Sequence, residues 1–265
     1  MNTPSVDDTA KLPGPAGVWS ILTRGAALFP RVAGRALPVY AIIAVIGMFE
    51  LAVSPQVQRA ALAERLLLEF LAALCVTFLA ADAWLGRAPV LSAALERVRP
   101  ALSLRALLLT IWIGAWAAAL SLLGGAAAEL AGRPFLRSLG MLAALIYLAG
   151  RIAVVYVLLL EDAAPREALE RGAGLMLAGG WRGRLASVGR AAVLLAAALA
   201  AGVIVGFMSR GMQEFRVQYA YSRFQWAFYG LSYLSILLEQ LAAVLAFTWF
   251  VGFYFDLRAR RDSGA

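Results

Sequence analysis

The sequence predicts an all-α, polytopic membrane protein with six transmembrane helices arranged as three hairpins. Two observations predict the membrane class. Of the 265 residues, 62% are hydrophobic and only 15% are charged, whereas soluble domains are close to half apolar and about one quarter charged. Several apolar runs are also long enough to cross a bilayer as helices. A third observation sets the order of the elements, because a short charged segment with helical periodicity precedes each pair of apolar runs.

The clearest of these charged segments lies between residues 158 and 190. Pro165 suits the first position of a helix, where its missing N–H costs nothing, and Gly179–Gly180 ends the predicted helix. The predicted apolar face comprises Leu169, Gly172, Ala173 and Met176. The opposite face holds two i,i+4 pairs of opposite charge, Arg166–Glu170 and Glu167–Arg171. We interpret the segment as an amphipathic helix on the membrane surface; an ordinary solvated helix in a loop is the alternative.

The other elements follow in chain order. Residues 1–17 are polar and turn-rich, and we expect them to form a disordered cytoplasmic tail rather than a signal peptide. Residues 18–35 are weakly amphipathic. Residues 87–105 form the second charged segment, in which Pro89 is expected to start the helix. Its predicted apolar stripe comprises Leu91, Leu95, Val98 and Leu102.

Between and after these segments, six spans are predicted. They cover residues 37–53, 66–86, 104–123, 135–160, 185–209 and 226–255. Loops are expected at residues 54–65, 124–134 and 210–225, and a basic tail at residues 258–265. We therefore expect a single membrane domain from residue 18 to residue 257.

The distribution of basic residues predicts the topology. Most of the 24 lysine and arginine residues stand before the first, third and fifth spans or after the sixth. Because basic residues accumulate on the cytoplasmic side, both termini and all three amphipathic helices are expected there. The net charge of +8 then indicates contact with anionic lipid headgroups rather than with nucleic acid.

The three charged segments share a short pattern that indicates an internal repeat. Residues 21–24 read ILTR, residues 94–97 read ALER and residues 168–171 read ALER. The matching positions include Arg24, Glu96, Arg97, Glu170 and Arg171. We expect three repeat units, at about residues 18–86, 87–160 and 161–257. Each unit enters from the same side, which is typical of parallel repeats and not of inverted ones.

The composition excludes several kinds of chemistry. The chain has no histidine and one cysteine, Cys75, so His-based metal sites, Ser–His–Asp triads and an internal disulfide are all excluded. No nucleotide-binding, hydrolase or zinc motif occurs. The sequence therefore predicts a protein that is not an enzyme and needs no cofactor or metal.

Charged residues inside the predicted spans are the best site candidates, because burying one is costly unless it is paired or faces water. Arg151, Asp82 and Glu239 lie at similar depths in the fourth, second and sixth spans. A pair between Arg151 and either Asp82 or Glu239 is geometrically allowed. Such a pair can fix the register of the helices, or the three residues can line a pathway for an ion or a lipid.

Two stretches resemble a known family. Leu160–Glu161 is followed by ALERG at residues 168–172 and by LAGGWR at residues 177–182, and residues 254–261 read YFDLRARR. These stretches resemble the glycerophosphoryl diester phosphodiesterase membrane domain and its uncharacterised bacterial inner-membrane relatives, although Gly172 stands where serine is commoner. The resemblance implies a six-span protein of the bacterial cytoplasmic membrane and a juxtamembrane ion pair, Asp256 with Arg258. It does not imply phosphodiesterase activity, because the chain has no room for the catalytic domain.

The sequence therefore predicts a general class of function and no specific activity. We expect a non-catalytic scaffold or lipid-interacting module in the membrane, with membrane lipids and a protein partner as its ligands. The first alternative is a transporter or channel for a small solute or lipid that uses Arg151, Asp82 and Glu239. The second is an intramembrane enzyme that acts on lipids, which requires carboxylates clustered at one headgroup level.

Overall fold

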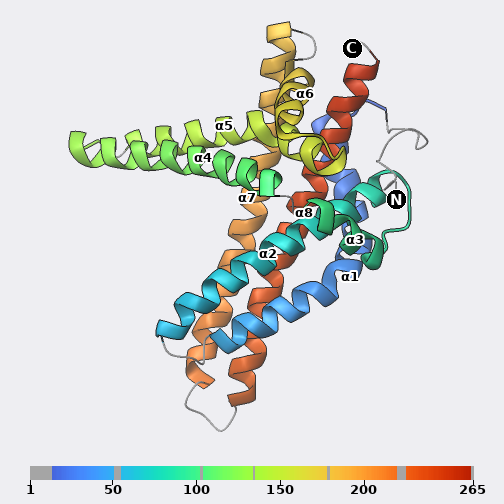
Figure 1. Ribbon diagram of the computed structural model, residues 1–265. Helices are drawn as coiled ribbons and strands as arrows, with labels where there is room; N and C mark the ends of the chain where they lie inside the picture. Colours follow the sequence, from blue (N-terminus) through green and yellow to red (C-terminus); the bar gives the residue numbers. More distant parts are fainter. Residues whose placement is uncertain are drawn as a thin grey trace. The chain divides into compact units, whose positions relative to one another are not determined.

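The computed structural model describes residues 14–50, 55–101, 104–133, 135–177, 180–219 and 225–263. The described residues form eight helices joined by short connections. These are α1 (Val18–Glu50), α2 (Pro55–Trp84), α3 (Leu91–Ala101), α4 (Leu104–Ala131), α5 (Phe135–Leu160), α6 (Pro165–Leu177), α7 (Gly180–Tyr219) and α8 (Gln225–Asp262). Figure 1 shows them along the chain.

Six of the helices are long and apolar enough to cross a membrane. The candidate spans within the described residues are Val18–Gly47, Leu67–Trp84, Ile111–Ala131, Phe135–Leu160, Gly180–Met212 and Trp226–Asp262. α3 and α6 are too short to cross and precede the third and fifth spans. The prediction of an all-α, multi-pass membrane protein with six spans is therefore confirmed.

Several helices extend beyond the predicted spans. α1 joins the weakly amphipathic segment and the first span into one helix of 33 residues, which contains Pro30 and Pro38. Prolines are tolerated inside membrane helices because neighbouring groups satisfy the freed backbone atoms. α2 begins at Pro55, α4 continues to Ala131 and α7 continues to Tyr219. Most of each predicted loop is thus helical, because the polar residues there do not break a helix whose ends can project into water.

Two helices end at a glycine with positive φ. After α2, Gly86 has a φ of 74°, its N–H donates to Ala83 O, and the Arg87 N–H donates to Asp82 O at 2.8 Å. After α4, Gly132 has a φ of 61° and makes the equivalent turn. Glycine suits this left-handed position because it has no Cβ.

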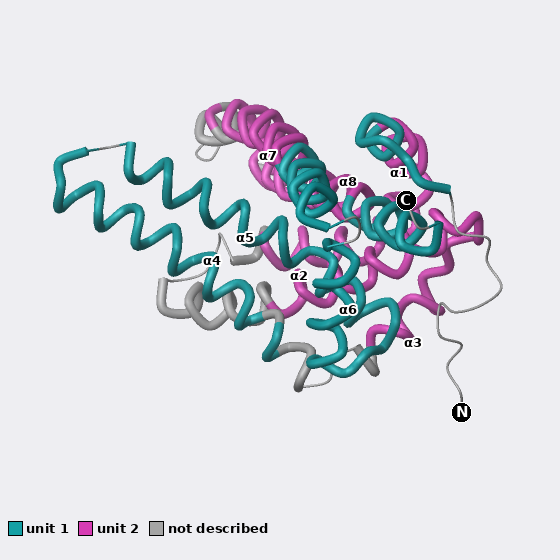
Figure 2. The backbone as a smooth tube through the Cα atoms, turned by 90° about the horizontal axis from the view of Figure 1, so that it is seen from above, with its two compact units in different colours: residues 1–22, 99–195, 250–265 teal, residues 23–98, 196–249 magenta. Residues whose placement is uncertain are grey.

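The chain divides into two compact units, shown in teal and magenta in Figure 2. Unit 1 comprises residues 1–22, 99–195 and 250–265, and unit 2 comprises residues 23–98 and 196–249. Helices α1, α3, α7 and α8 each contribute a part to both units. The predicted repeat boundaries stay a prediction, and the two units are described separately.

In unit 1, α4 and α5 form a hairpin, and the two helices run side by side (Figure 1). A Cβ atom added to Gly124 would lie 2.4 Å from Gly140 Cα. The two backbones therefore touch at this pair of glycines, as small residues allow in membrane helix pairs. Most large apolar side chains along the outer faces of the hairpin are exposed within the chain, as expected for helices that face lipid.

α6 packs on α5 in the same unit. A Cβ atom at Gly172 would lie 2.6 Å from Val154 Cα, so only glycine permits this contact. The buried face of α6 comprises Ala168, Gly172, Leu175 and Met176. Gly172 and Met176 of the predicted apolar face are buried as expected. Leu169 and Ala173 are only half-buried, and Ala168 and Leu175 are buried in their place.

α3 differs from its prediction in the same way. It begins at Leu91 and not at Pro89. Ala94 and Val98 are buried, whereas Leu95, placed on the predicted apolar stripe, is 50% exposed. Leu102 lies outside the described residues. The small Ala94 lets the helix approach its neighbours, and the bulky Leu95 is left on the outer side.

Unit 2 has its own core. Its fully buried side chains include Tyr40 and Ile43 of α1 and Val76 and Leu79 of α2. The Trp84 indole N–H donates to Thr248 O at 2.8 Å, which links the end of α2 to α8. This bond satisfies a buried polar group that the aromatic ring carries into the core.

Candidate functional site

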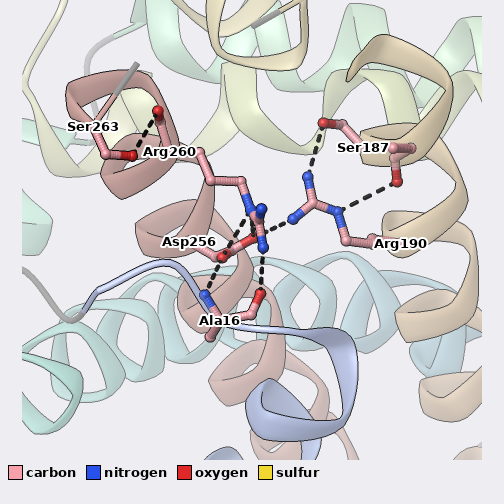
Figure 3. A network of polar contacts seen from close by, with 7 residues as sticks. Ala16, Ser187, Arg190, Asp256, Arg260 and Ser263 are labelled. Carbon is pink, nitrogen blue, oxygen red and sulfur yellow. Dashed lines mark hydrogen bonds and ion pairs between the residues drawn. The ribbon is translucent and has the colours of Figure 1, made fainter. Parts of the chain in front are cut away.

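The most buried carboxylate of unit 1 is at the centre of a polar cluster (Figure 3). The Asp256 side chain on α8 is 1% exposed. The Arg190 guanidinium of α7 lies 2.6 Å from it, and the Arg260 guanidinium lies one turn along α8 at 3.0 Å. We call these residues, with Ala16, the Asp256 cluster. Two guanidinium groups around one carboxylate offset the cost of burying it.

The Asp256 cluster also binds the beginning of the described chain. The Ala16 N–H donates to Asp256 Oδ1 at 2.6 Å, and Arg260 Nη2 donates to Ala16 O at 2.7 Å. Arg190 also donates to Ser187 Oγ at 3.1 Å. Residues near the two ends of the chain are therefore held together. The prediction of a disordered tail over residues 1–17 is wrong for Ala16, and residues 1–13 lie outside the described residues.

A second carboxylate of unit 1 has several partners. Glu161 follows α5, and its side chain is 10% exposed. Arg171 of α6 lies 3.0 Å away, Arg258 of α8 lies 3.9 Å away, and the Tyr254 hydroxyl donates to Glu161 Oε1. We call these four residues the Glu161 cluster. It connects the end of a span, a short helix and the last helix.

The predicted ion pair between Asp256 and Arg258 needs correction. Asp256 pairs with Arg190 and Arg260, and Arg258 pairs with Glu161. Residues two positions apart point to different sides of a helix, whereas residues four apart share a face. The predicted basic tail also begins too early, because α8 is helical through Asp262.

Unit 2 contains an ion pair at the end of its second span. Asp82 lies in the last turn of α2, with its side chain 6% exposed, and Arg97 of α3 donates to it at 2.9 Å. In the same unit, Arg24 Nη2 donates to Trp84 O at 3.3 Å, and its guanidinium lies 4.8 Å from the centre of the Trp84 ring. Cations are attracted to the face of an indole ring in this way.

The three arginines of the shared sequence pattern therefore make related contacts. Arg24 and Arg97 bind residues of the last turn of α2, and Arg171 binds Glu161 directly after α5. The first residue of each pattern, Ile21, Ala94 or Ala168, is fully buried. The glutamates are exposed, and Glu170 forms the predicted pair with Arg166 at 3.1 Å. The predicted Glu167–Arg171 pair is likewise confirmed, at 2.6 Å.

The remaining predicted charges have partners of other kinds. Arg151, half-buried on α5, lies 5.7 Å from the centre of the Tyr147 ring. In unit 2, Glu239 accepts a hydrogen bond from the Ser209 hydroxyl at 2.7 Å, and Ser209 also bonds to Ser235. Asp82 pairs with Arg97, as described above. The structure thus gives each of the three candidate charges a partner within its own unit.

Neither the described residues nor the comparisons indicate a reaction. Among the residues described, no group of three or more histidine, cysteine or carboxylate side chains could hold a metal ion. Comparison with protein-family models, curated proteins and solved structures found no match. The resemblance of residues 160–182 and 254–261 to the membrane-domain family stays a prediction.

Sequence reasoning missed Arg190 and Tyr254, and it did not recognise Glu161 as a site. The spacing of Asp256 and Arg260 on one helix could have shown their pairing. A carboxylate directly after an apolar span could have drawn attention to Glu161. No pattern in the sequence indicates that Arg190 reaches Asp256, because the two residues are 66 positions apart.

Proposed function

We propose that this chain is a non-catalytic, lipid-interacting scaffold of the bacterial cytoplasmic membrane, with both termini and the two short helices α3 and α6 on the cytoplasmic side. One observation carries the proposal. Arg97 of α3 and Arg171 of α6 are each paired with a carboxylate at the end of the preceding span. Such pairs fix the orientation of a short helix relative to the span before it. A scaffold requires surface helices of fixed orientation, because its partners bind to them.

The pairing of the buried carboxylates with arginines supports this proposal. Asp256, the most buried carboxylate among the described residues of unit 1, is bound by two guanidinium groups and a backbone N–H. Charges that serve transport or catalysis need access to water or substrate, whereas Asp256 and Asp82 are buried with cationic partners. Their contacts support a role in holding helices in place.

The internal repeat extends the proposal. Arg24, Arg97 and Arg171 each contact the end of a span, and the residue three positions before each of them is fully buried. These similarities favour one structural unit used three times, a helix at the membrane surface followed by two spans. The exposed Glu96 and Glu170 then lie at matching positions of two repeat units, where a protein partner can contact them.

Photo-crosslinking tests the scaffold. A photoreactive amino acid placed at Glu96 or Glu170 in the full-length protein in bacterial cells should give protein adducts of discrete mass. The adducts from Glu96 should fall at least severalfold when Arg97→Gln releases α3. A control variant, Arg184→Gln, changes an exposed arginine of α7 and should leave the adducts unchanged. Adducts that persist in Arg97→Gln, or none at either position, contradict the scaffold.

A transporter or channel is the second candidate. The observation that favours it is the polar row of Ser209, Ser235 and Glu239 within the apolar α7 and α8, together with the 3.1 Å hydrogen bond from Gln240 to Glu69. Polar groups at such depth often mark a pathway. Ion flux into proteoliposomes that is abolished by Glu239→Gln would support transport, and flux equal to that of protein-free vesicles would exclude an ion channel.

A further inference from the structure

Unit 2 contains a pocket whose lining is strongly basic. The pocket has a volume of about 630 Å³ and is formed by one turn of α1 and by the connection between α2 and α3. Arg31 and Arg35 contribute from α1, and Arg87 contributes from the connection. The volume lies within the range of about 300–1,000 Å³ that is usual for small-molecule sites.

The three arginines of the pocket differ from five other arginines near the ends of the spans. Arg97, Arg171, Arg190, Arg258 and Arg260 are each paired with a carboxylate. No acidic residue is among the described residues that line the pocket. Arg31, Arg35 and Arg87 are exposed, and within the described part of the chain their guanidinium groups form no ion pair. Their positive charge is left for an external anion to balance.

The local structure gathers these three charges. Arg31 and Arg35 are four residues apart and so lie on one face of α1. The glycine turn at Gly86 directs the chain from the end of α2 to Arg87. Arg24 holds α1 against the end of α2 through Trp84. Arg24 therefore joins α1 to the end of α2, and the guanidinium groups of the pocket arginines are not needed for this contact.

Two glycines line the pocket and leave space beside them. A Cβ atom added at Gly34 or at Gly86 would have no heavy atom within 4 Å, and both residues line the pocket. Gly34 lies beside Arg31 and Arg35 on α1. A large side chain at Gly34 could therefore occupy the space in front of the guanidinium groups without removing any charge.

We propose that this pocket binds a phosphate-bearing anion, with Arg31, Arg35 and Arg87 as its ligands. Guanidinium groups bind phosphate oxygens in a bidentate manner and keep their charge at every physiological pH. The phosphate can belong to an anionic phospholipid headgroup or to a soluble phosphate compound. A lipid source rests on the proposed function, because it requires the pocket to lie at the cytoplasmic surface of the membrane; the binding chemistry does not depend on the scaffold.

The test uses purified full-length protein in nanodiscs or detergent and three variants. The first, Arg31→Gln/Arg35→Gln/Arg87→Gln, removes the pocket charges. The second, Gly34→Phe, fills the pocket and keeps the charges. The control, Arg182→Gln/Arg184→Gln/Arg261→Gln, removes the same charge from exposed arginines of α7 and α8.

The binding of phosphate from two sources, a lipid and a soluble compound, is measured. Retention of phosphatidic acid over phosphatidylcholine by native mass spectrometry tests the lipid, and calorimetry with inorganic phosphate and glycerol 3-phosphate tests the soluble source. The proposal predicts that affinity for at least one source falls about tenfold or more in the first two variants and stays unchanged in the control. The source that shows this pattern is the one that supplies the phosphate.

Two results would overturn the proposal. One is that the control variant weakens binding as much as the pocket variant, which would mean general attraction to surface charge. The other is that no phosphate source distinguishes Gly34→Phe from the unmodified chain. Either result leaves the scaffold intact, because photo-crosslinking at Glu96 or Glu170 tests it separately.

Discussion

Asp256 on α8 and Arg190 on α7 are 66 positions apart in the sequence, and their side chains lie 2.6 Å apart in a buried ion pair. Arg260 and the backbone of Ala16 complete the surroundings of the Asp256 carboxylate. The pair therefore connects α7, α8 and the segment before α1. Its removal should affect the chain more than the loss of any surface pair.

Asp256→Asn tests this relationship. The variant leaves Arg190 and Arg260 beside a neutral amide, and breaking a buried pair by removing one partner typically costs about 3–5 kcal/mol. The free energy of unfolding in detergent should fall by an amount of that order. The control is Glu170→Gln, which removes an exposed partner of Arg166 and should cost less than about 1 kcal/mol. Equal effects of the two variants would show that the Asp256 cluster does not stabilise the fold.

Gly172→Ala should weaken the packing of α6 on α5. The added Cβ would lie 2.6 Å from Val154 Cα, so the backbones must separate, at a cost of roughly 1–3 kcal/mol. Gly174→Ala is the matched control on the same helix, because its Cβ would meet nothing within 4 Å. It should stabilise the helix by up to about 1 kcal/mol. Thermal unfolding of both variants checks the prediction, and a stable Gly172→Ala variant would contradict the close contact.

Cysteine labelling tests the predicted topology. Cys75 is buried and can be replaced by serine, after which single cysteines are introduced by Arg133→Cys and Ser263→Cys. A membrane-impermeant maleimide should label the cysteine at position 133 in intact spheroplasts. The cysteine at position 263 should react only after the membrane is opened, because the positive-inside rule places this end in the cytoplasm. The reverse pattern would invert the topology.

The sequence predicted the spanning helices better than the contacts of the charged residues. α5 has the predicted bounds, Phe135–Leu160, and α6 starts at Pro165 as expected. Apolar length and the proline signal are local properties, and so are the i,i+4 pairs of α6. Each can be derived from neighbouring residues without knowledge of the fold.

The cluster contacts depend on tertiary structure and could not be derived in this way. Glu161 receives partners from α6 and α8, and Asp256 receives Arg190 from α7. The predicted apolar faces of α3 and α6 are wrong at Leu95, which is exposed, and at Leu169, which is only half-buried. Where two helices approach closely, the neighbouring Ala94 and Ala168 are buried instead, since burying small residues brings the backbones together.

The ion pair between Asp82 and Arg97 offers the most direct test of the central claim, that arginines of the repeated pattern hold the short helices on the ends of the spans. A double-mutant cycle of Asp82→Asn and Arg97→Gln, measured by reversible unfolding of the full-length protein, should give a coupling of about 0.5–3 kcal/mol. The exposed Glu129–Arg137 pair serves as the control cycle and should couple by less than about 1 kcal/mol. A coupling of zero between Asp82 and Arg97 would contradict the claim.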